Sequence, residues 1–196
     1  MKVAFGMKAH SGWAALVVVG KRDGEFVVVD RRRLELVEDE WAKQPYHAAE
    51  DLERESARDV VERGVEAAHR IAIREMRAAV KRERERENEV VACAVLVANP
   101  MPDWSIEEIF AVHFRMHKAE GVLFRDALGR AANACGVRLV AIPETLLTKD
   151  AGRVLETPVS GLVKKMATLG KSLGPPWGRD QKDAALAALV ALQGRP

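Results

Sequence analysis

An unbroken apolar run from Val90 to Ala98 restricts the fold of this chain most strongly. The run, Val-Val-Ala-Cys-Ala-Val-Leu-Val-Ala, is rich in β-branched residues and far too short to cross a membrane. A short continuous run of this kind is typical of a central strand whose two faces are both covered. Together with the helices expected before and after it, this strand predicts an α/β fold.

The first 40 residues predict an antiparallel meander. Residues 2–19 form one long strand, or two strands around a kink between Lys8 and Gly12, and residues 21–24 are a hairpin turn signal. Two further strands are expected at 25–30 and 33–37, with a bend at the three arginines between them. The meander supplies the antiparallel part of the expected sheet.

The second half of the chain predicts parallel strands. The apolar strand is followed by a helix opened by the Ser105 and Glu108 capping box, a second helix over 117–134 and a strand over 137–142. A strand–helix–strand unit implies parallel pairing through a right-handed crossover. Further helices are expected at 160–169 and 183–193. The predicted fold is therefore a mixed five-stranded sheet, an antiparallel meander plus parallel strands, flanked by helices.

A long charged helix is expected from about Ala48 to Asn88, since this stretch has no proline, one glycine and apolar residues at helical spacing. At 1.5 Å per residue it would be roughly 60 Å long, so it projects or it breaks near Gly64. We expect a homodimer because such a helix needs something to lie against. The 196 residues are expected to form one domain.

Two carboxylates three residues apart, Asp180 and Asp183, precede a helix of small residues near the end of the chain. This spacing places both on one helix face, as a shared divalent cation requires. A plain structural role is also open, with Asp180 as N-cap and Asp183 favoured by the helix dipole. The spacing by itself leaves both interpretations open.

Positive charge gathers before this pair, although the net charge of the whole chain is only +2. Residues 149–182 hold seven Lys or Arg and three Asp or Glu, a surplus of four positive charges. Trp177 is a candidate for stacking on a nucleic-acid base. The expected nucleic-acid-binding residues are Lys164, Lys165, Lys171, Trp177 and Arg179.

Several segments together resemble the ribonuclease-H-like superfamily, most closely the RuvC-type Holliday-junction resolvases. Asp180-x-x-Asp183-Ala184-Ala185-Leu186-Ala187 matches the closing pattern of that family, and Gly6-Met7-Lys8 falls at its opening strand. Similar matches are Ala119-Glu120-Gly121-Val122, Val137-Arg138-Leu139-Val140-Ala141-Ile142-Pro143 and Ser160-Gly161-Leu162-Val163-Lys164-Lys165-Met166. The resemblance covers about 130 residues as a pattern, without long identity.

The resemblance implies a site of four acidic or metal-binding side chains around two magnesium ions that cleave a phosphodiester. Asp180 and Asp183 match the last two positions. The acid of the first strand is replaced by Lys8, and Val95 to Asn99 supply no acid in the fourth strand. We therefore expect an ion pair from Lys8 to Asp183 or Asp180, no cofactor, and a nucleic-acid- or protein-binding role with DNA or RNA as partner.

Two other functions stay open. The first is an active endonuclease that uses Asp180 and Asp183, with Mg²⁺ or Mn²⁺ and a third ligand such as Glu144 or His10. The second is a structural or regulatory protein without nucleic-acid contact. Separately, His113 and His117 have the i, i+4 spacing of a metal-binding pair or of an ordinary exposed pair, and Glu120 is a guess for a third ligand.

The sequence also indicates the cellular compartment. Cys93 and Cys135 lack CxxC spacing and are expected to be small buried side chains in a reducing environment. The first residues lack the pattern of a signal peptide, and no run of 18 apolar residues occurs. We therefore expect a cytoplasmic protein without a membrane partner.

Overall fold

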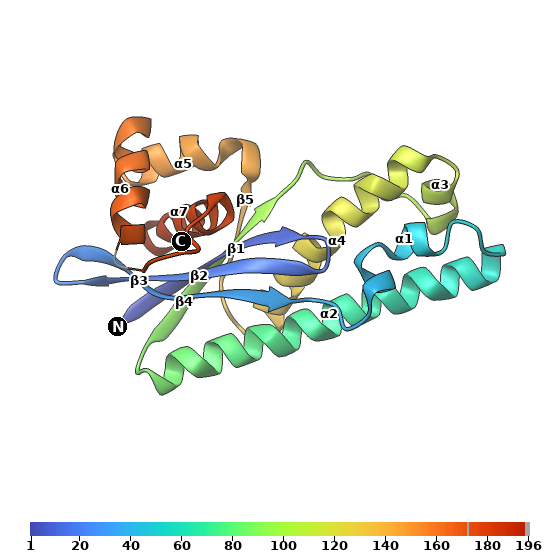
Figure 1. The fold of residues 1–196 in the computed structure, drawn as a ribbon, viewed down its shortest axis with the longest axis horizontal. Helices are drawn as coiled ribbons and strands as arrows, with labels where there is room; N and C mark the ends of the chain where they lie inside the picture. Colours follow the sequence, from blue (N-terminus) through green and yellow to red (C-terminus); the bar gives the residue numbers. More distant parts are fainter. Residues whose placement is uncertain (172, 195–196) are drawn as a thin grey trace.

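The fold is a five-stranded mixed sheet with helices on both faces, as the sequence predicts (Figure 1). A computed structural model describes residues 1–171 and 173–194 of the chain, and the side chain of Lys171 lies outside that description. The strand order is β3-β2-β1-β4-β5, with β4 and β5 parallel to β1 and the first three strands antiparallel. The strands are β1 Lys2–His10, β2 Trp13–Arg22, β3 Glu25–Glu35, β4 Glu89–Val97 and β5 Leu139–Pro143.

The edge strand β3 is continuous, so the predicted bend at Arg31–Arg33 is wrong. Arg31, Arg32 and Arg33 pair with β2 inside the ladder, and the irregularity is a register shift between Val18 and Val19. At this edge of the sheet neither face of the strand is fully covered, so Arg31 is only partly buried and Arg32 and Arg33 are exposed. The three-residue charge run therefore marks the edge of the sheet.

Helices α2 and α4 cover one face of the sheet, and α5, α6 and α7 lie on the other face (Figure 1). Alternate residues of β1 separate the two cores, with Val3, Phe5 and Met7 facing α2 and α4 and Ala4 facing α7. None of the helices in the described residues is long and apolar enough to span a bilayer. The helices are α1 Pro45–Ala48, α2 Arg54–Glu85, α3 Ile106–Phe110, α4 His113–Ala134, α5 Leu147–Val154, α6 Val159–Lys171 and α7 Arg179–Gln193, with short 3-10 turns η1 Glu40–Lys43 and η2 Glu144–Leu146.

The long helix α2 is unbroken over 32 residues and starts later than predicted. At Gly64 an added Cβ would lie 2.6 Å from the Cβ of Pro45, so this glycine makes room for α1 and does not break the helix. One half of α2 packs on the sheet, and the other half passes beyond it to pack on α1, α3 and α4. The helix therefore packs on other elements of the same chain. The need for a packing partner no longer argues for a homodimer, which stays a prediction.

Helix α7 lies directly on β1. An added Cβ at Gly6 would lie 1.8 Å from the carbonyl oxygen of Ala184, a distance that no side chain tolerates. The small residues of α7, Ala184, Ala185, Ala187 and Ala188, are fully buried against the sheet. This close approach places the first turn of α7 beside the end of β1.

Candidate functional site

Lys8 stands at the centre of a cluster of three carboxylates. It lies on the same face of β1 as Gly6 and is only 7% exposed. Its Nζ atom donates a hydrogen bond to Oδ2 of Asp183 at 2.7 Å, and lies 3.0 Å from Oε1 of Glu144 and 3.4 Å from Oδ1 of Asp180. The ion pair expected from the sequence is therefore present, and Glu144, which the sequence suggested as a replacement ligand, joins it.

Two arginines complete this cluster, which we call the Lys8 cluster. Nη2 of Arg125 lies 3.7 Å from Oε2 of Glu144, and Nε of Arg179 lies 3.6 Å from Oδ2 of Asp183. With Lys8 these make three positive groups against three carboxylates. The cluster is therefore balanced in charge by the side chains of the chain itself. Arg125 lies on α4, on the opposite face of the sheet from α7, and no sequence pattern singled it out.

The ionisation of the Lys8 cluster follows from these contacts. Burial alone would lower the pKa of Lys8, but the hydrogen bonds to Asp183 and Glu144 and the charges of both acids outweigh it, so this pKa is raised. Burial alone would raise the pKa of Glu144, but Lys8, Arg125 and Arg179 together lower it. Each group thus favours the charged form of its partner.

His10 lies at the rim of the Lys8 cluster. Its Nε2 atom is 3.2 Å from Oδ2 of Asp180, in an orientation that does not make a hydrogen bond. The ring stacks on Trp13 with centroids 4.3 Å apart, and the guanidinium of Arg33 covers Trp13 at 4.0 Å. Both residues named from the sequence as replacement ligands, Glu144 and His10, therefore lie at the same site.

Local structure explains how the acids converge. Glu144 opens η2 directly after β5, and both aspartates lie in the first turn and a half of α7. Gly178 is the N-cap of α7, and its backbone N–H donates to Oε1 of Gln181 at 2.9 Å. The interpretation of Asp180 as N-cap is therefore wrong, since Asp180 follows the cap and faces Lys8.

The end of β4 provides no acid, as the sequence indicated. A pocket of about 380 Å³ lies beside the Lys8 cluster, lined by Val97, Ala98, Asn99, Glu144, Thr145 and Arg179. The resemblance implies an acid within Val95 to Asn99, and Asn99, two residues after the end of β4, is the polar side chain of that stretch. A metal ion needing several oxygen ligands would find Lys8 within the carboxylate group, so the residues present do not fit a pair of magnesium ions.

The loop before α7 is held by two side chains. Arg31 donates hydrogen bonds to the backbone oxygens of Leu173, Gly174 and Pro175 at 2.9–3.0 Å, and to that of Pro176. Nε1 of Trp177 donates to the carbonyl of Met166 at 2.8 Å, and the indole packs on Gly170. Trp177 thus anchors the loop, and its proposed stacking on a base stays a prediction.

The other basic candidates lie on α6 and α7. Arg179 has an 84% exposed side chain, Lys164 is exposed, and Nζ of Lys165 lies 4.7 Å from the ring centroid of Phe26. The side chain of Lys171 falls outside the described part of the chain. Arg179 borders the Lys8 cluster, whereas Lys165 lies over Phe26 beside the β2–β3 hairpin, at the other end of the sheet from Lys8.

The two histidines at i, i+4 spacing form a separate group. His113 and His117 lie on the first two turns of α4, which begins four residues earlier than predicted, and His47 of α1 joins them. The sequence offered no signal for His47, because only the fold brings it near α4. Glu120, the guessed third ligand, contacts His47 instead.

Comparison with known proteins identifies the fold. No protein-family model matches the chain, and no curated protein does either. Two structures of Thermus thermophilus RuvC match, one of them in complex with Holliday-junction substrate. The first is 16% identical with a TM-score of 0.50, covering 96% of this chain and 92% of that one. The complex is 15% identical with a TM-score of 0.52, covering 97% and 92%. The chain therefore has the RuvC-type, ribonuclease-H-like fold.

Proposed function

We propose that this chain is a nucleic-acid-binding protein of RuvC fold in which the Lys8 cluster replaces a two-metal nuclease centre. The observation that carries the proposal is the position of Lys8 Nζ, within 3.4 Å of carboxylate oxygens from Glu144, Asp180 and Asp183. Metal-dependent phosphodiester cleavage requires that such oxygens bind cations from solution. Here an ammonium group of the chain holds them.

Electrostatics supports this exclusion of metal. An ammonium about 4 Å from a unit charge interacts by roughly 4 kcal/mol at an effective dielectric of 20, and a divalent ion at that distance would be repelled more strongly. The charges of Arg125 and Arg179 act in the same direction. A cation would therefore have to displace Lys8 and leave its ammonium without its partners.

Nucleic-acid binding is supported by basic side chains on the α7 side of the sheet. The surplus of four positive charges over residues 149–182 includes Lys164, Lys165 and Arg179 on the same face of the sheet as α7. Exposed basic side chains of this kind neutralise phosphates. One of the matched RuvC structures is a complex with Holliday-junction substrate, so a four-way DNA junction is the first ligand to test.

The test measures binding and cleavage on the same DNA. A labelled four-way junction and a duplex of equal length are titrated at several salt concentrations, and cleavage is then followed with Mg²⁺ or Mn²⁺. We expect binding that weakens steeply with salt, and no cleavage. The double change Lys164→Glu, Lys165→Glu should weaken binding at least tenfold. Lys81→Glu is the matched control, since Lys81 is 79% exposed on α2, across the sheet.

The outcomes separate the candidate functions. Absence of binding to either DNA at low salt would leave a structural or regulatory protein. Metal-dependent cleavage that is lost in Asp183→Asn would establish the second candidate, an active endonuclease. That candidate is favoured by one observation, the gathering of His10 with all three acids in one cluster. It requires Lys8 to leave the carboxylates when metal and DNA bind.

A further inference from the structure

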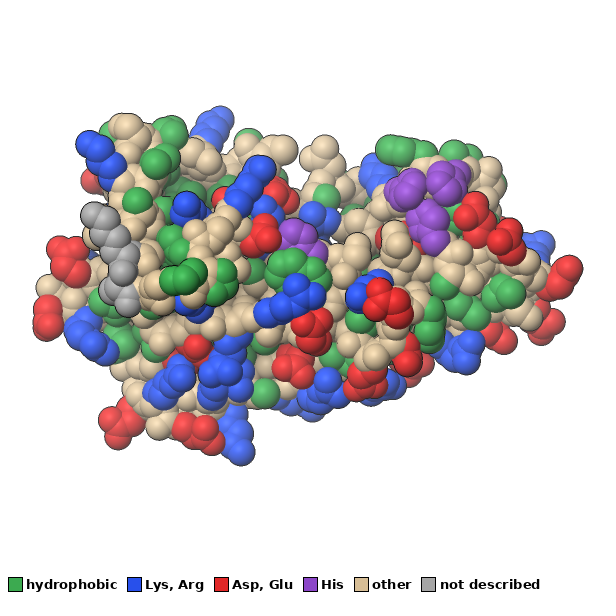
Figure 2. All heavy atoms as spheres, in the orientation of Figure 1, with side chains coloured by type: hydrophobic (Ala, Val, Ile, Leu, Met, Phe, Trp, Pro, Cys, Tyr) green, Lys and Arg blue, Asp and Glu red, His purple; other side chains and the backbone are tan. Residues whose placement is uncertain are grey.

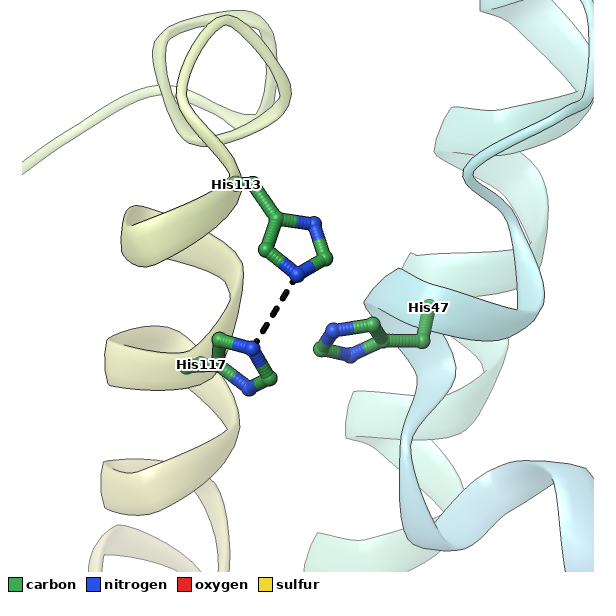
Figure 3. A group of neighbouring side chains, drawn as sticks. All are labelled: His47, His113 and His117. Atoms are coloured by element: carbon green, nitrogen blue, oxygen red, sulfur yellow. Dashed lines mark hydrogen bonds between the residues drawn. The ribbon is translucent and has the colours of Figure 1, made fainter.

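We propose that His47, His113 and His117 form a Zn²⁺-binding site, independent of the Lys8 cluster and of the proposed function. Each of the three offers a ring nitrogen, and these atoms all lie within 4.8 Å of one another. Figure 3 shows the three rings converging from two helices on one point, with Nε2 of His113 and Nε2 of His117 3.1 Å apart. We call this group the histidine cluster.

Helix α1 and the first turns of α4 position the histidine cluster. His113 is the first residue of α4 and His117 follows one turn later, so both face the same side. His47 lies in α1, which the packing of Pro45 on Gly64 fixes against α2. The ring of His47 is 4.5 Å from that of His117 and 5.2 Å from that of His113, measured between centroids.

Carboxylates outside the cluster orient two of the rings. Oε2 of Glu120 lies 2.7 Å from Nδ1 of His47, while its Oε1 accepts from the backbone N–H of His47 at 3.1 Å. Oε1 of Glu50 lies 3.2 Å from Nδ1 of His113. A carboxylate on one ring nitrogen directs the lone pair of the other nitrogen toward a metal, the usual arrangement behind metal-binding histidines.

The remaining nitrogen of His47 has no partner. Its Nε2 atom is buried, and it forms no hydrogen bond within the described residues. A buried polar atom without a partner is costly. Since Glu120 takes Nδ1, Nε2 is the atom that is left free to bind a metal.

The buried carboxylate of Glu120 has His47 as its ion-pair partner, and it also accepts a hydrogen bond from Nε2 of Gln44 at 3.5 Å. Glu120 is only 6% exposed, and within residues 1–171 and 173–194 no lysine or arginine nitrogen lies within ion-pair distance of it. A buried carboxylate without a compensating charge is strongly unfavourable. A divalent ion on His47 would supply that charge through the imidazole.

The donor set favours a transition-metal ion such as Zn²⁺ over Mg²⁺. Imidazole nitrogens suit Zn²⁺, whereas Mg²⁺ requires oxygen ligands. Tetrahedral zinc with Zn–N bonds of 2.0–2.1 Å places neighbouring nitrogens about 3.3 Å apart, close to the observed separation of His113 and His117. Figure 2 shows histidine side chains gathered at the surface above α1 and the start of α4. The fourth zinc position would therefore face solvent and hold water.

The test uses the metal alone. The full chain, prepared without a polyhistidine tag and stripped with a chelator, is titrated with Zn²⁺ by calorimetry, and its thermal unfolding is followed in parallel. Visible absorption of bound Co²⁺ reports tetrahedral coordination independently. We expect one Zn²⁺ per chain and a melting temperature that rises with Zn²⁺ but not with Mg²⁺.

Variants locate the binding site. His47→Ala, His113→Ala and His117→Ala should each lower Zn²⁺ affinity more than tenfold, and Glu120→Gln or Glu50→Gln about 10–100-fold. His69→Gln, a histidine outside the cluster that faces Asp126, is the matched control and should leave affinity unchanged. Should His47→Ala fail to fold, the surface change Glu50→Gln and the exposed His117 variant still decide. The proposal is overturned if the chain binds no Zn²⁺, or if these variants bind Zn²⁺ as tightly as wild type. Lys8→Asp should leave Zn²⁺ binding at the histidine cluster intact.

Discussion

Nζ of Lys8 lies 2.7 Å from Oδ2 of Asp183, a contact between residues 175 positions apart. It joins the first strand to the last helix at the edge where both meet Glu144. The ammonium and the carboxylate are each largely removed from water, with side chains 8% and 24% exposed. This hydrogen bond therefore connects two elements from opposite ends of the chain, β1 and α7.

Asp183→Asn should destabilise the chain. The change removes the negative charge that pairs with Lys8, although the amide oxygen can still accept its hydrogen bond, so a loss near the lower end of about 1.5–3 kcal/mol is expected because Asp183 is also partly exposed. Urea unfolding measures the difference. Asp180→Asn is the matched control, since its oxygen is 3.4 Å from Nζ and a smaller effect is expected. Equal losses in the two variants would contradict the ranking of these contacts.

Lys8→Asp should create affinity for Mg²⁺ or Mn²⁺. The change replaces the central positive charge by a fourth carboxylate among Glu144, Asp180 and Asp183. Metal at 100 times its Kd would stabilise the variant by about 2.7 kcal/mol. That corresponds to a melting temperature higher by roughly 2–4 °C for each kcal/mol. Wild type should not respond to millimolar Mg²⁺.

Lys8→Met separates charge removal from ligand addition. It deletes the ammonium without supplying an oxygen, so metal binding should be weaker than in Lys8→Asp. A wild-type chain whose melting temperature rises clearly with Mg²⁺ would argue against the Lys8 cluster as a replacement for metal.

The Lys8 cluster should contribute stability over a wide but bounded pH range. The pKa of Glu144 is lowered from 4.5, so its contribution is complete above about pH 4.5 and is lost as pH falls through the lower folded value. The pKa of Lys8 is raised from 10.5, so its contribution is complete below that pH and is lost as pH rises through the higher folded value. Unfolding free energies of wild type and Glu144→Gln should therefore differ at pH 7 and converge in acid. A difference that grows below pH 4 would reverse the sign of this linkage.

Gly6→Ala should be severely destabilising. A Cβ would lie 1.8 Å from the backbone oxygen of Ala184, so α7 would have to move off β1 at an expected loss of at least about 3 kcal/mol. Gly121→Ala on α4 is the control, because the nearest atom is 3.9 Å away and alanine stabilises a helix by about 0.5–1 kcal/mol. Thermal unfolding compares the two. A Gly6→Ala chain as stable as wild type would contradict the close packing of α7.

Arg31→Ala should loosen the loop before α7, since this guanidinium is bonded to the backbone oxygens of residues 173–176. Amide hydrogen exchange over residues 173–180 should become faster, while exchange in α2 stays unchanged. Arg32→Ala, whose side chain contacts Asp30 instead, is the control. Unaltered exchange in the loop would show that Trp177 alone holds it.

Periodicity and turn signals were sufficient to predict the sheet, because β2 and β4 contain the uninterrupted apolar runs Ala14–Val19 and Val90–Val97 and the parallel unit follows from chain order. The pair Lys8 and Asp183 came from a family pattern that survives at low identity. Arg125 and His47 were missed, since their partners are distant in sequence and lie on other elements. Gly64 and the arginines of β3 were misjudged because local propensity does not show that Pro45 packs on Gly64 or that β3 is an edge strand.

The backbone contact at Gly6 has a consequence for any ion that approaches the acids. Because α7 lies directly against β1, the helix holds Asp180 and Asp183 at a fixed position relative to the strand that carries Lys8. An ion could reach these carboxylates only when the Lys8 side chain rotates away from them. The rate at which the ion binds would therefore report the rotation of that one side chain.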